Sequence, residues 1–271
     1  MMRSALVLAG HSLRRMRTLL VTMTAILAGF QVLVTALADW LATSSAFGQI
    51  AGIVPPNVRA LMGSGFLTFM SVSGIVALGY FHTAVIAALV ALVMVVATEP
   101  VAEIEAGFAD LAQSRSVSRA AVMLRTLALA ILCPTAVVAA MGAGTAAGVH
   151  WVLRDGVPGP EPATVAAIIV NLWALLLAWG GIAMAVGSGA RRRATAVGIV
   201  GAAALVTMLM DYLARAWTTL QKVAWLSPFH FYSPLELVTG TPLSVSNVLT
   251  LAGIGAAGAA AAFVIFARRD V

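Results

Sequence analysis

The stretch GIVALGYFHTAVIAALVALVMVVAT, residues 74–98, contains no aspartate, glutamate, lysine or arginine. A helix needs about 20 mainly apolar residues to cross the hydrocarbon core of a bilayer, which is roughly 30 Å thick, so this stretch is long enough to span a membrane. The rest of the 271-residue chain agrees, because 61% of its residues are hydrophobic, only 10% are charged, and the mean hydropathy is +1.01. These values predict an integral membrane protein.

Five further segments satisfy the same criterion of length and apolarity. The predicted spans are residues 18–41, 74–98, 121–148, 163–187, 194–213 and 245–266. No long polar segment and no internal repeat divides the chain, so residues 1–271 are interpreted as a single membrane domain. The predicted fold class is all-α, a polytopic membrane protein with six transmembrane helices.

Basic residues collect at alternate ends of these spans. If the N-terminus is cytoplasmic, only four of the 16 lysines and arginines lie outside, and the other 12 lie inside. Those four are Arg59, Arg154, Arg215 and Lys222. The positive-inside rule therefore places both termini in the cytoplasm. The basic residues form no basic and aromatic groove, so we expect the lipid bilayer, and no nucleic acid, as a partner of this surface.

Two segments outside the spans have a distinctive composition. Residues 1–17 combine an apolar helical stripe with several arginines, which predicts an amphipathic elbow helix lying in the cytoplasmic interface; a frayed basic tail is the alternative. Residues 214–244 form the longest connection on the extracytoplasmic side. Trp217, Trp225 and Tyr232 lie in it, as expected for aromatic rings at the level of the lipid headgroups.

The sequence does not indicate the chemistry of an enzyme. The four histidines are scattered without metal-ligand spacing, and Cys133 is the only cysteine, so we predict no catalytic residue and no metal site. Polar uncharged side chains within the spans are candidates for a substrate path, although each can instead form a hydrogen-bond bridge between helices. They are Gln31, Thr35, Asn171 and Thr207.

Charged and small residues within the spans add two expectations. Asp39 and Asp211 lie close to the outer ends of their spans, where headgroups and water reach them, and a role in a substrate path is the alternative. Runs of small residues at 141–148 and 252–262 predict close helix contacts in the third and sixth spans, and Pro134 allows a kink in the third.

A polar stretch, EIEAGFADLAQSRSVSR, residues 103–119, separates the second and third predicted spans. Val101, two residues before it, and Ile104, Phe108 and Leu111 within it recur at helical spacing, so the stretch predicts a short amphipathic helix. The orientation of the spans places this helix in the cytoplasm. An ordinary cytoplasmic loop in contact with lipid headgroups is the alternative interpretation.

This stretch resembles the loop between the second and third spans of type-2 ABC transporter permeases. In that family a glycine stands four positions after an acidic residue. A second acid and leucines follow the glycine, and the pattern ends with Val-Ser-Arg. The matching residues are Glu103, Gly107, Asp110, Leu111, Val117, Ser118 and Arg119, whereas Phe108, Ala109 and Ser116 depart from the pattern. The segment LSPFHFYSPLEL, residues 226–237, is similar to the family's segment before the last span.

The resemblance implies that residues 99–119 form a coupling helix that inserts into a groove on a separate cytoplasmic ABC ATPase subunit. Two ATPase copies and a second permease copy, identical or related, would complete the complex in a bacterial-type inner or plasma membrane. The interface residues implied in this way are Glu103, Gly107, Phe108, Asp110, Leu111, Arg115, Ser118 and Arg119.

The energy source implied by the resemblance lies in the partner. The chain contains no G-x-x-x-x-G-K-[ST] phosphate-binding loop, so ATP and Mg²⁺ are expected in the ATPase subunit and no cofactor is expected in this chain. The family consists mostly of exporters, which implies outward movement of an amphipathic or hydrophobic substrate. An ATP-independent secondary carrier and a membrane scaffold are the alternatives.

Overall fold

The computed structural model describes residues 2–44, 53, 71–107, 118–215 and 217–268, and all regular structure within these ranges is helical. The six predicted spans are confirmed as helices that are long and apolar enough to cross a membrane. The second span consists of two helices, α4 and α5. The spanning helices are α1 (Met2–Thr43), α4 (Val72–Phe81) with α5 (Thr83–Ala97), α8 (Arg119–Trp151), α9 (Pro162–Gly189), α10 (Arg193–Ala214) and α13 (Val245–Ala267).

A separate interfacial helix before the first span is not confirmed, because α1 continues without a break from Met2 to Thr43. Its 42 residues correspond to about 63 Å at 1.5 Å per residue, twice the thickness of the hydrocarbon core. The junction predicted near residue 17 contains leucine, arginine, methionine and threonine but no proline or glycine. Nothing in this composition ends a helix.

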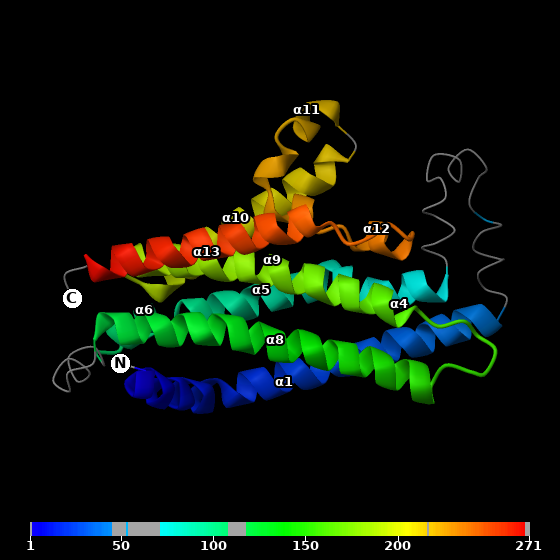
Figure 1. Ribbon diagram of the computed structural model, residues 1–271, viewed down its shortest axis with the longest axis horizontal. Helices are drawn as coiled ribbons and strands as arrows, with labels where there is room; N and C mark the ends of the chain where they lie inside the picture. Colours follow the sequence, from blue (N-terminus) through cyan, green and yellow to red (C-terminus); the bar gives the residue numbers. More distant parts are fainter. Residues whose placement is uncertain (1, 45–52, 54–70, 108–117, 216, 269–271) are drawn as a thin grey trace.

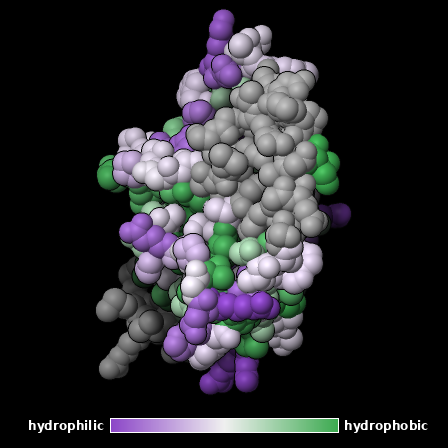
Figure 2. Space-filling view, turned by 90° about the vertical axis from the view of Figure 1, so that its right-hand side faces the viewer, coloured by the Kyte–Doolittle hydropathy of each residue, from purple (hydrophilic) through white to green (hydrophobic). Residues whose placement is uncertain are grey.

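Short helices lie at the two ends of the bundle. α6 (Glu99–Glu105) lies at the end that also holds the start of α1 and the end of α13, called here the terminal end (Figure 1). α12 (Pro234–Val238) lies at the opposite, far end, whereas α11 (Thr218–Gln221) stands away from the bundle. Hydrophilic and hydrophobic side chains adjoin one another on the surface of the far end (Figure 2). Two 3₁₀ turns, η1 (Ala224–Leu226) and η2 (Pro228–Phe231), connect α11 to α12.

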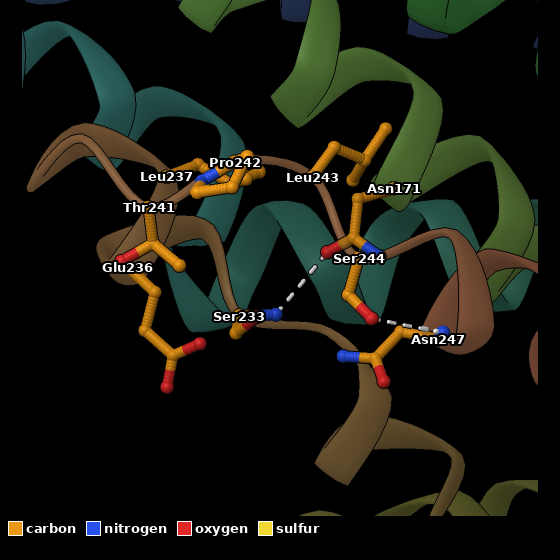
Figure 3. Close-up of a pocket in the computed structure, with 9 residues that line it drawn as sticks. All are labelled: Asn171, Ser233, Glu236, Leu237, Thr241, Pro242, Leu243, Ser244 and Asn247. Carbon is orange, nitrogen blue, oxygen red and sulfur yellow. Dashed lines mark hydrogen bonds between the residues drawn. The ribbon is translucent and has the colours of Figure 1, made fainter.

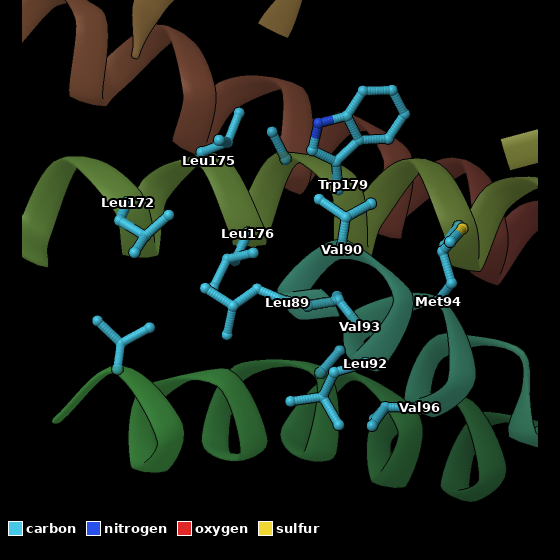
Figure 4. Packing of buried hydrophobic residues seen from close by; sticks show 14 of the residues in the cluster. Leu89, Val90, Leu92, Val93, Met94, Val96, Leu172, Leu175, Leu176 and Trp179 are labelled. Atoms are coloured by element: carbon cyan, nitrogen blue, oxygen red, sulfur yellow. The ribbon is translucent and has the colours of Figure 1, made fainter. Parts of the chain in front are cut away.

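The hydrophobic core is centred on α5, which packs between α8 and α9 (Figure 4). Leu89 and Val93 of α5 are completely buried, and Val93 lies against Gly180 of α9. Because apolar residues surround α5 on most sides, its sequence is an almost continuous run of apolar residues. The core therefore places α5 at the centre of the described bundle.

Small residues bring two pairs of helices into close contact, α1 with α8 and α9 with α13. A Cβ atom added at Gly255 of α13 would lie 2.7 Å from the Leu177 carbonyl oxygen of α9, and one added at Gly144 of α8 would overlap the Ala28 carbonyl of α1. Such backbone approach tolerates no larger residue. It explains the short runs of glycine and alanine in α8 and α13.

The second span is interrupted at His82, where the backbone has a ψ of 129°. The His82 Nδ1 atom accepts a hydrogen bond from the Ala84 N–H at 3.3 Å. The Tyr232 hydroxyl, from the connection between η2 and α12, donates to the Tyr80 carbonyl at 3.2 Å. Side chains therefore bond main-chain groups that a continuous helix would pair with each other.

Replacing Tyr232 with phenylalanine is expected to lower the free energy of unfolding by about 1 to 2 kcal/mol, because the buried Tyr80 carbonyl loses its donor. Burial raises the pKa of Tyr232 far above its usual range, so the hydroxyl remains a donor at alkaline pH. Equilibrium unfolding in mixed micelles measures the change. The control is Tyr212→Phe on the surface of α10, where the side chain is 73% exposed and the expected change is below about 0.5 kcal/mol. Equal effects of both substitutions would contradict the assignment.

Candidate functional site

The helix α6 follows α5 directly because of a threonine and a proline. Proline is accepted in the first turn of a helix but not in its interior, so Pro100 ends α5 and lets α6 begin at Glu99. Thr98 forms the junction, and its hydroxyl donates to the Met94 carbonyl at 2.7 Å. Pro100 and Val101 are buried. α6 is therefore seated against the spans.

The acidic residue at the centre of α6 forms a two-point ion pair with α8. The Arg125 guanidinium donates to both carboxylate oxygens of Glu103, at 2.6 and 2.8 Å. The Arg125 side chain is 2% exposed and that of Glu103 is 22% exposed. Paired geometry of this kind is the strongest arrangement available to arginine and carboxylate.

The other two acids of α6 contact α1 and α10. The buried Glu99 carboxylate lies 3.5 Å from Arg15 Nη1 and 3.9 Å from Arg193 Nη2. The backbone N–H of Arg193 donates to Glu105 Oε2 at 3.0 Å. Arg193 Nη2 also donates to the Val95 carbonyl of α5 at 2.8 Å.

Two carboxylates of α6, those of Glu99 and Glu103, thus pair with guanidinium groups from three spans, and Glu105 adds a hydrogen bond from the backbone of α10. We call this group the α6 ion-pair cluster; it consists of Glu99, Glu103, Glu105, Arg15, Arg125 and Arg193. Its formal charges cancel. The Glu99 and Arg125 side chains are buried, and a buried charge is costly to separate from its partners, so α6 is held to α1, α8 and α10.

The residues after α6 divide into described and undescribed positions. Gly107 has a φ of +72°, the left-handed conformation that ends many helices, and a Cβ added there would meet no atom within 4 Å. Residues 108–117 lie outside the described ranges. Four predicted interface residues fall among them, and their roles stay predictions: Phe108, Asp110, Leu111 and Arg115.

The last two predicted interface residues begin α8. The Ser118 hydroxyl accepts a hydrogen bond from the Ala121 N–H at 3.2 Å and caps the helix. Arg119 Nη1 donates to the Ala267 carbonyl at the end of α13, at 3.1 Å. Both residues therefore have structural contacts, and an interface role for them also stays a prediction.

The four candidate substrate-path residues are not brought together. Gln31 and Thr35 are completely buried on α1. Asn171 is buried on α9, and the Thr207 hydroxyl donates to the Ala203 carbonyl of its own helix α10 at 2.7 Å. A path lined by all four is not visible in the described residues, and their role in transport stays a prediction.

Gln31 belongs to a buried polar network that joins three helices. Its Oε1 atom accepts from the Thr145 hydroxyl of α8 at 3.4 Å, and Thr145 in turn lies 2.7 Å from the Tyr80 hydroxyl of α4. Gln31 Nε2 has no hydrogen-bond partner among the described residues. The network therefore bridges helices and leaves one donor unsatisfied.

Asn171 holds the connection at the far end in place. Its Nδ2 atom donates to the Phe231 carbonyl, and its Oδ1 atom accepts from the Ser233 N–H, both at 3.1 Å. A cavity of about 30 Å³ adjoins it, between Ser233 and Asn247 (Figure 3). This volume has room for about one water molecule, so the cavity is too small for cargo, and a transport role for Asn171 stays a prediction.

The two aspartates at the ends of spans are both paired. Asp39 Oδ2 lies 3.2 Å from Arg154 Nε. Asp211 lies 3.2 Å from Arg215 Nη2 and 3.6 Å from His230 Nδ1. Within the ranges that the structure describes, no three His, Cys, Asp or Glu side chains form a group able to hold a metal ion.

Sequence reasoning identified Glu103 but missed its partner. Glu99, Arg125 and Arg193 looked like isolated charges at the ends of three different spans, and positive-inside counting treated the arginines only as markers of orientation. One available signal was that Glu99 is an acid directly at the end of a span. An acid at that depth needs a partner, although the sequence does not say which arginine supplies it.

Comparison with known proteins does not assign the chain to a family. No protein-family model matches it, and no curated protein is a significant relative. The resemblance to type-2 ABC permeases therefore rests on the residues quoted above. Independently of that resemblance, the structure shows six helices able to span a membrane and a short helix fixed to three of them by ion pairs.

Proposed function

We propose that this chain is the membrane-spanning permease subunit of an ATP-driven exporter of the type-2 ABC class. It would move an amphipathic or hydrophobic substrate outward. The observation that carries the proposal is the α6 ion-pair cluster, which fixes a short helix between the second and third spans to α1, α8 and α10. A free loop would need no such attachment.

Stiff attachment is what a coupling element requires. Shifting a two-state transporter from 1:99 to 99:1 takes a differential of about 5.5 kcal/mol, and a floppy loop would dissipate that difference. α6 is joined to α5 through Thr98 and to three other spans through its acids. A force applied at α6 would therefore act on four of the six spans.

The partners in this proposal follow from charge and from the resemblance. The excess of arginine at the terminal end supports a cytoplasmic position for α6 and both termini, where a soluble ATPase would reach α6. Two ATPase subunits would bind ATP and Mg²⁺, and a second permease copy or a related chain would complete the path. The left-handed Gly107 would let the partner approach the backbone at the end of α6.

The proposal predicts that Gly107→Trp and Phe108→Asp uncouple ATP hydrolysis from transport. Loss of one well-packed anchor costs enough binding free energy to reduce coupled transport about tenfold. The complex is recovered from its native membrane by a tag on the full-length chain, and both rates are measured after reconstitution. Gly240→Trp is the matched control, because Gly240 also has a positive φ with no neighbouring atom but follows α12 at the far end.

Two results would count against this function. The first is a pull-down from the native membrane that recovers no ATPase, together with transport that persists when cellular ATPases are blocked; it would favour an ATP-independent carrier. The second is wild-type coupling in both variants, which would make residues 103–119 an ordinary cytoplasmic loop. Membrane insertion of each variant is checked first, so that lost coupling is not confused with lost protein.

A further inference from the structure

A cavity of about 700 Å³ lies between α8, α9 and the connection that joins them at the far end. Its volume falls within the roughly 300–1,000 Å³ of typical ligand sites. The walls are mainly apolar and include Ala146 and Val149 of α8 and Val165 and Ile169 of α9. The cavity is separate from α6, and none of the four candidate substrate-path residues lines it.

The depth of the cavity matches one leaflet of a bilayer. It follows α8 from Gly142 to His150, about 12 Å at 1.5 Å per residue, against a leaflet of about 15 Å. The inner end is closed by contact between α8 and α9, since a Cβ on Gly142 would lie 2.7 Å from Ile169 Cδ1. At the outer end Trp151 is 78% exposed, as is common at the level of the headgroups.

Two opposite charges stand at the outer rim. Arg154 and Asp155 both line the cavity. The buried Asp39 carboxylate holds Arg154 in place, through Nε at 3.2 Å and through the backbone N–H at 3.0 Å. Among the described residues this leaves the two terminal nitrogens of Arg154 for a ligand, in the fork geometry that suits phosphate. Asp155 adds a carboxylate that accepts hydrogen bonds from an ammonium group.

We propose that this cavity binds one zwitterionic phospholipid that carries a primary ammonium group. An acyl chain lies between α8 and α9, the phosphate contacts Arg154, and the ammonium contacts Asp155. The apolar walls, which extend over about one leaflet, favour an amphiphile of the outer leaflet. The adjacent opposite charges of Arg154 and Asp155 favour a headgroup that itself carries both charges. The site needs only a membrane around the far end and does not depend on ATP-driven export.

Filling the cavity tests whether a lipid occupies it. Ala146 lines the cavity, whereas Ala143, one turn away on α8, is exposed and does not line it. The full-length protein is titrated with phosphatidylethanolamine, and bound lipid is counted by native mass spectrometry. Ala146→Trp is expected to weaken retention of the first lipid about tenfold, and Ala143→Trp to leave it unchanged. Equal retention in the two variants overturns the proposal.

Changing the rim tests which headgroup is bound. The wild-type protein is expected to retain phosphatidylethanolamine in preference to phosphatidylglycerol with the same acyl chains. Asp155→Asn removes the charged acceptor for the ammonium, so that preference is expected to fall about tenfold. Equal retention of the two lipids by the wild-type protein, or an unchanged preference in Asp155→Asn, overturns the assignment of the headgroup.

Discussion

Replacing Arg125 with methionine is expected to lower the free energy of unfolding by about 3 kcal/mol. Removing one partner of a buried ion pair costs about 3 to 5 kcal/mol because the other charge stays buried without compensation. The Glu103 side chain keeps 22% exposure, so water reaches it and the lower end of the range applies. Equilibrium unfolding by titration with sodium dodecyl sulfate in mixed micelles measures the loss.

A double-mutant cycle shows whether the loss comes from the pair itself. Glu103→Gln together with Arg125→Met removes both charges, so the double variant is expected to lose clearly less stability than the two single losses added. Arg14→Met is the control, since Arg14 is exposed on α1 and pairs with no acid among the described residues, so its loss costs below about 0.5 kcal/mol. Strict additivity in the cycle would contradict the coupling of Glu103 to Arg125.

Adding one methyl group is expected to have opposite effects at two glycines of α13. Gly255→Ala places a Cβ 2.7 Å from the Leu177 carbonyl oxygen of α9, whereas Gly253→Ala meets no atom within 4 Å. The first forces two helix backbones apart at a cost of about 2 kcal/mol or more. The second replaces glycine inside a helix and stabilises it by about 0.5 to 1 kcal/mol.

The same unfolding titration measures both glycine variants. The two positions lie two residues apart in one helix, so differences in helix propensity or in detergent binding cannot produce a change of sign. Unchanged or increased stability of Gly255→Ala would show that α9 and α13 do not approach each other as closely as Gly255 and Leu177 indicate.

Sequence reasoning recovered the features that depend on local composition. Each span is an apolar run whose length is set by the bilayer, so all six could be located to within a few residues, except that α1 extends far beyond its span. The small residues at 252–262 correctly predicted a close contact. Which glycine faces the neighbouring helix was not predictable, because rotation of α13 about its axis depends on the shape of α9.

Features that depend on distant partners were not recovered. The break at His82 involves a hydrogen bond from Tyr232, which lies 152 residues from Tyr80 in the chain. The ion pair of Glu103 needs Arg125 from another helix, and many arginines stand at the ends of spans. In both cases the sequence shows a polar residue that requires a partner, and only the packing of the helices decides which residue it is.

The interruption at His82 divides the second span into two helices, α4 and α5, with a joint between them. The segment toward the terminal end, α5, has 15 residues and is about 22 Å long, with α6 attached at one end and the joint at the other. A tilt of about 10° around the joint would carry the α6 end through about 4 Å. The other segment, α4, need not follow, because the Tyr80 hydroxyl and carbonyl bond Thr145 and Tyr232. A movement at the terminal end of the second span would then leave its far end in place.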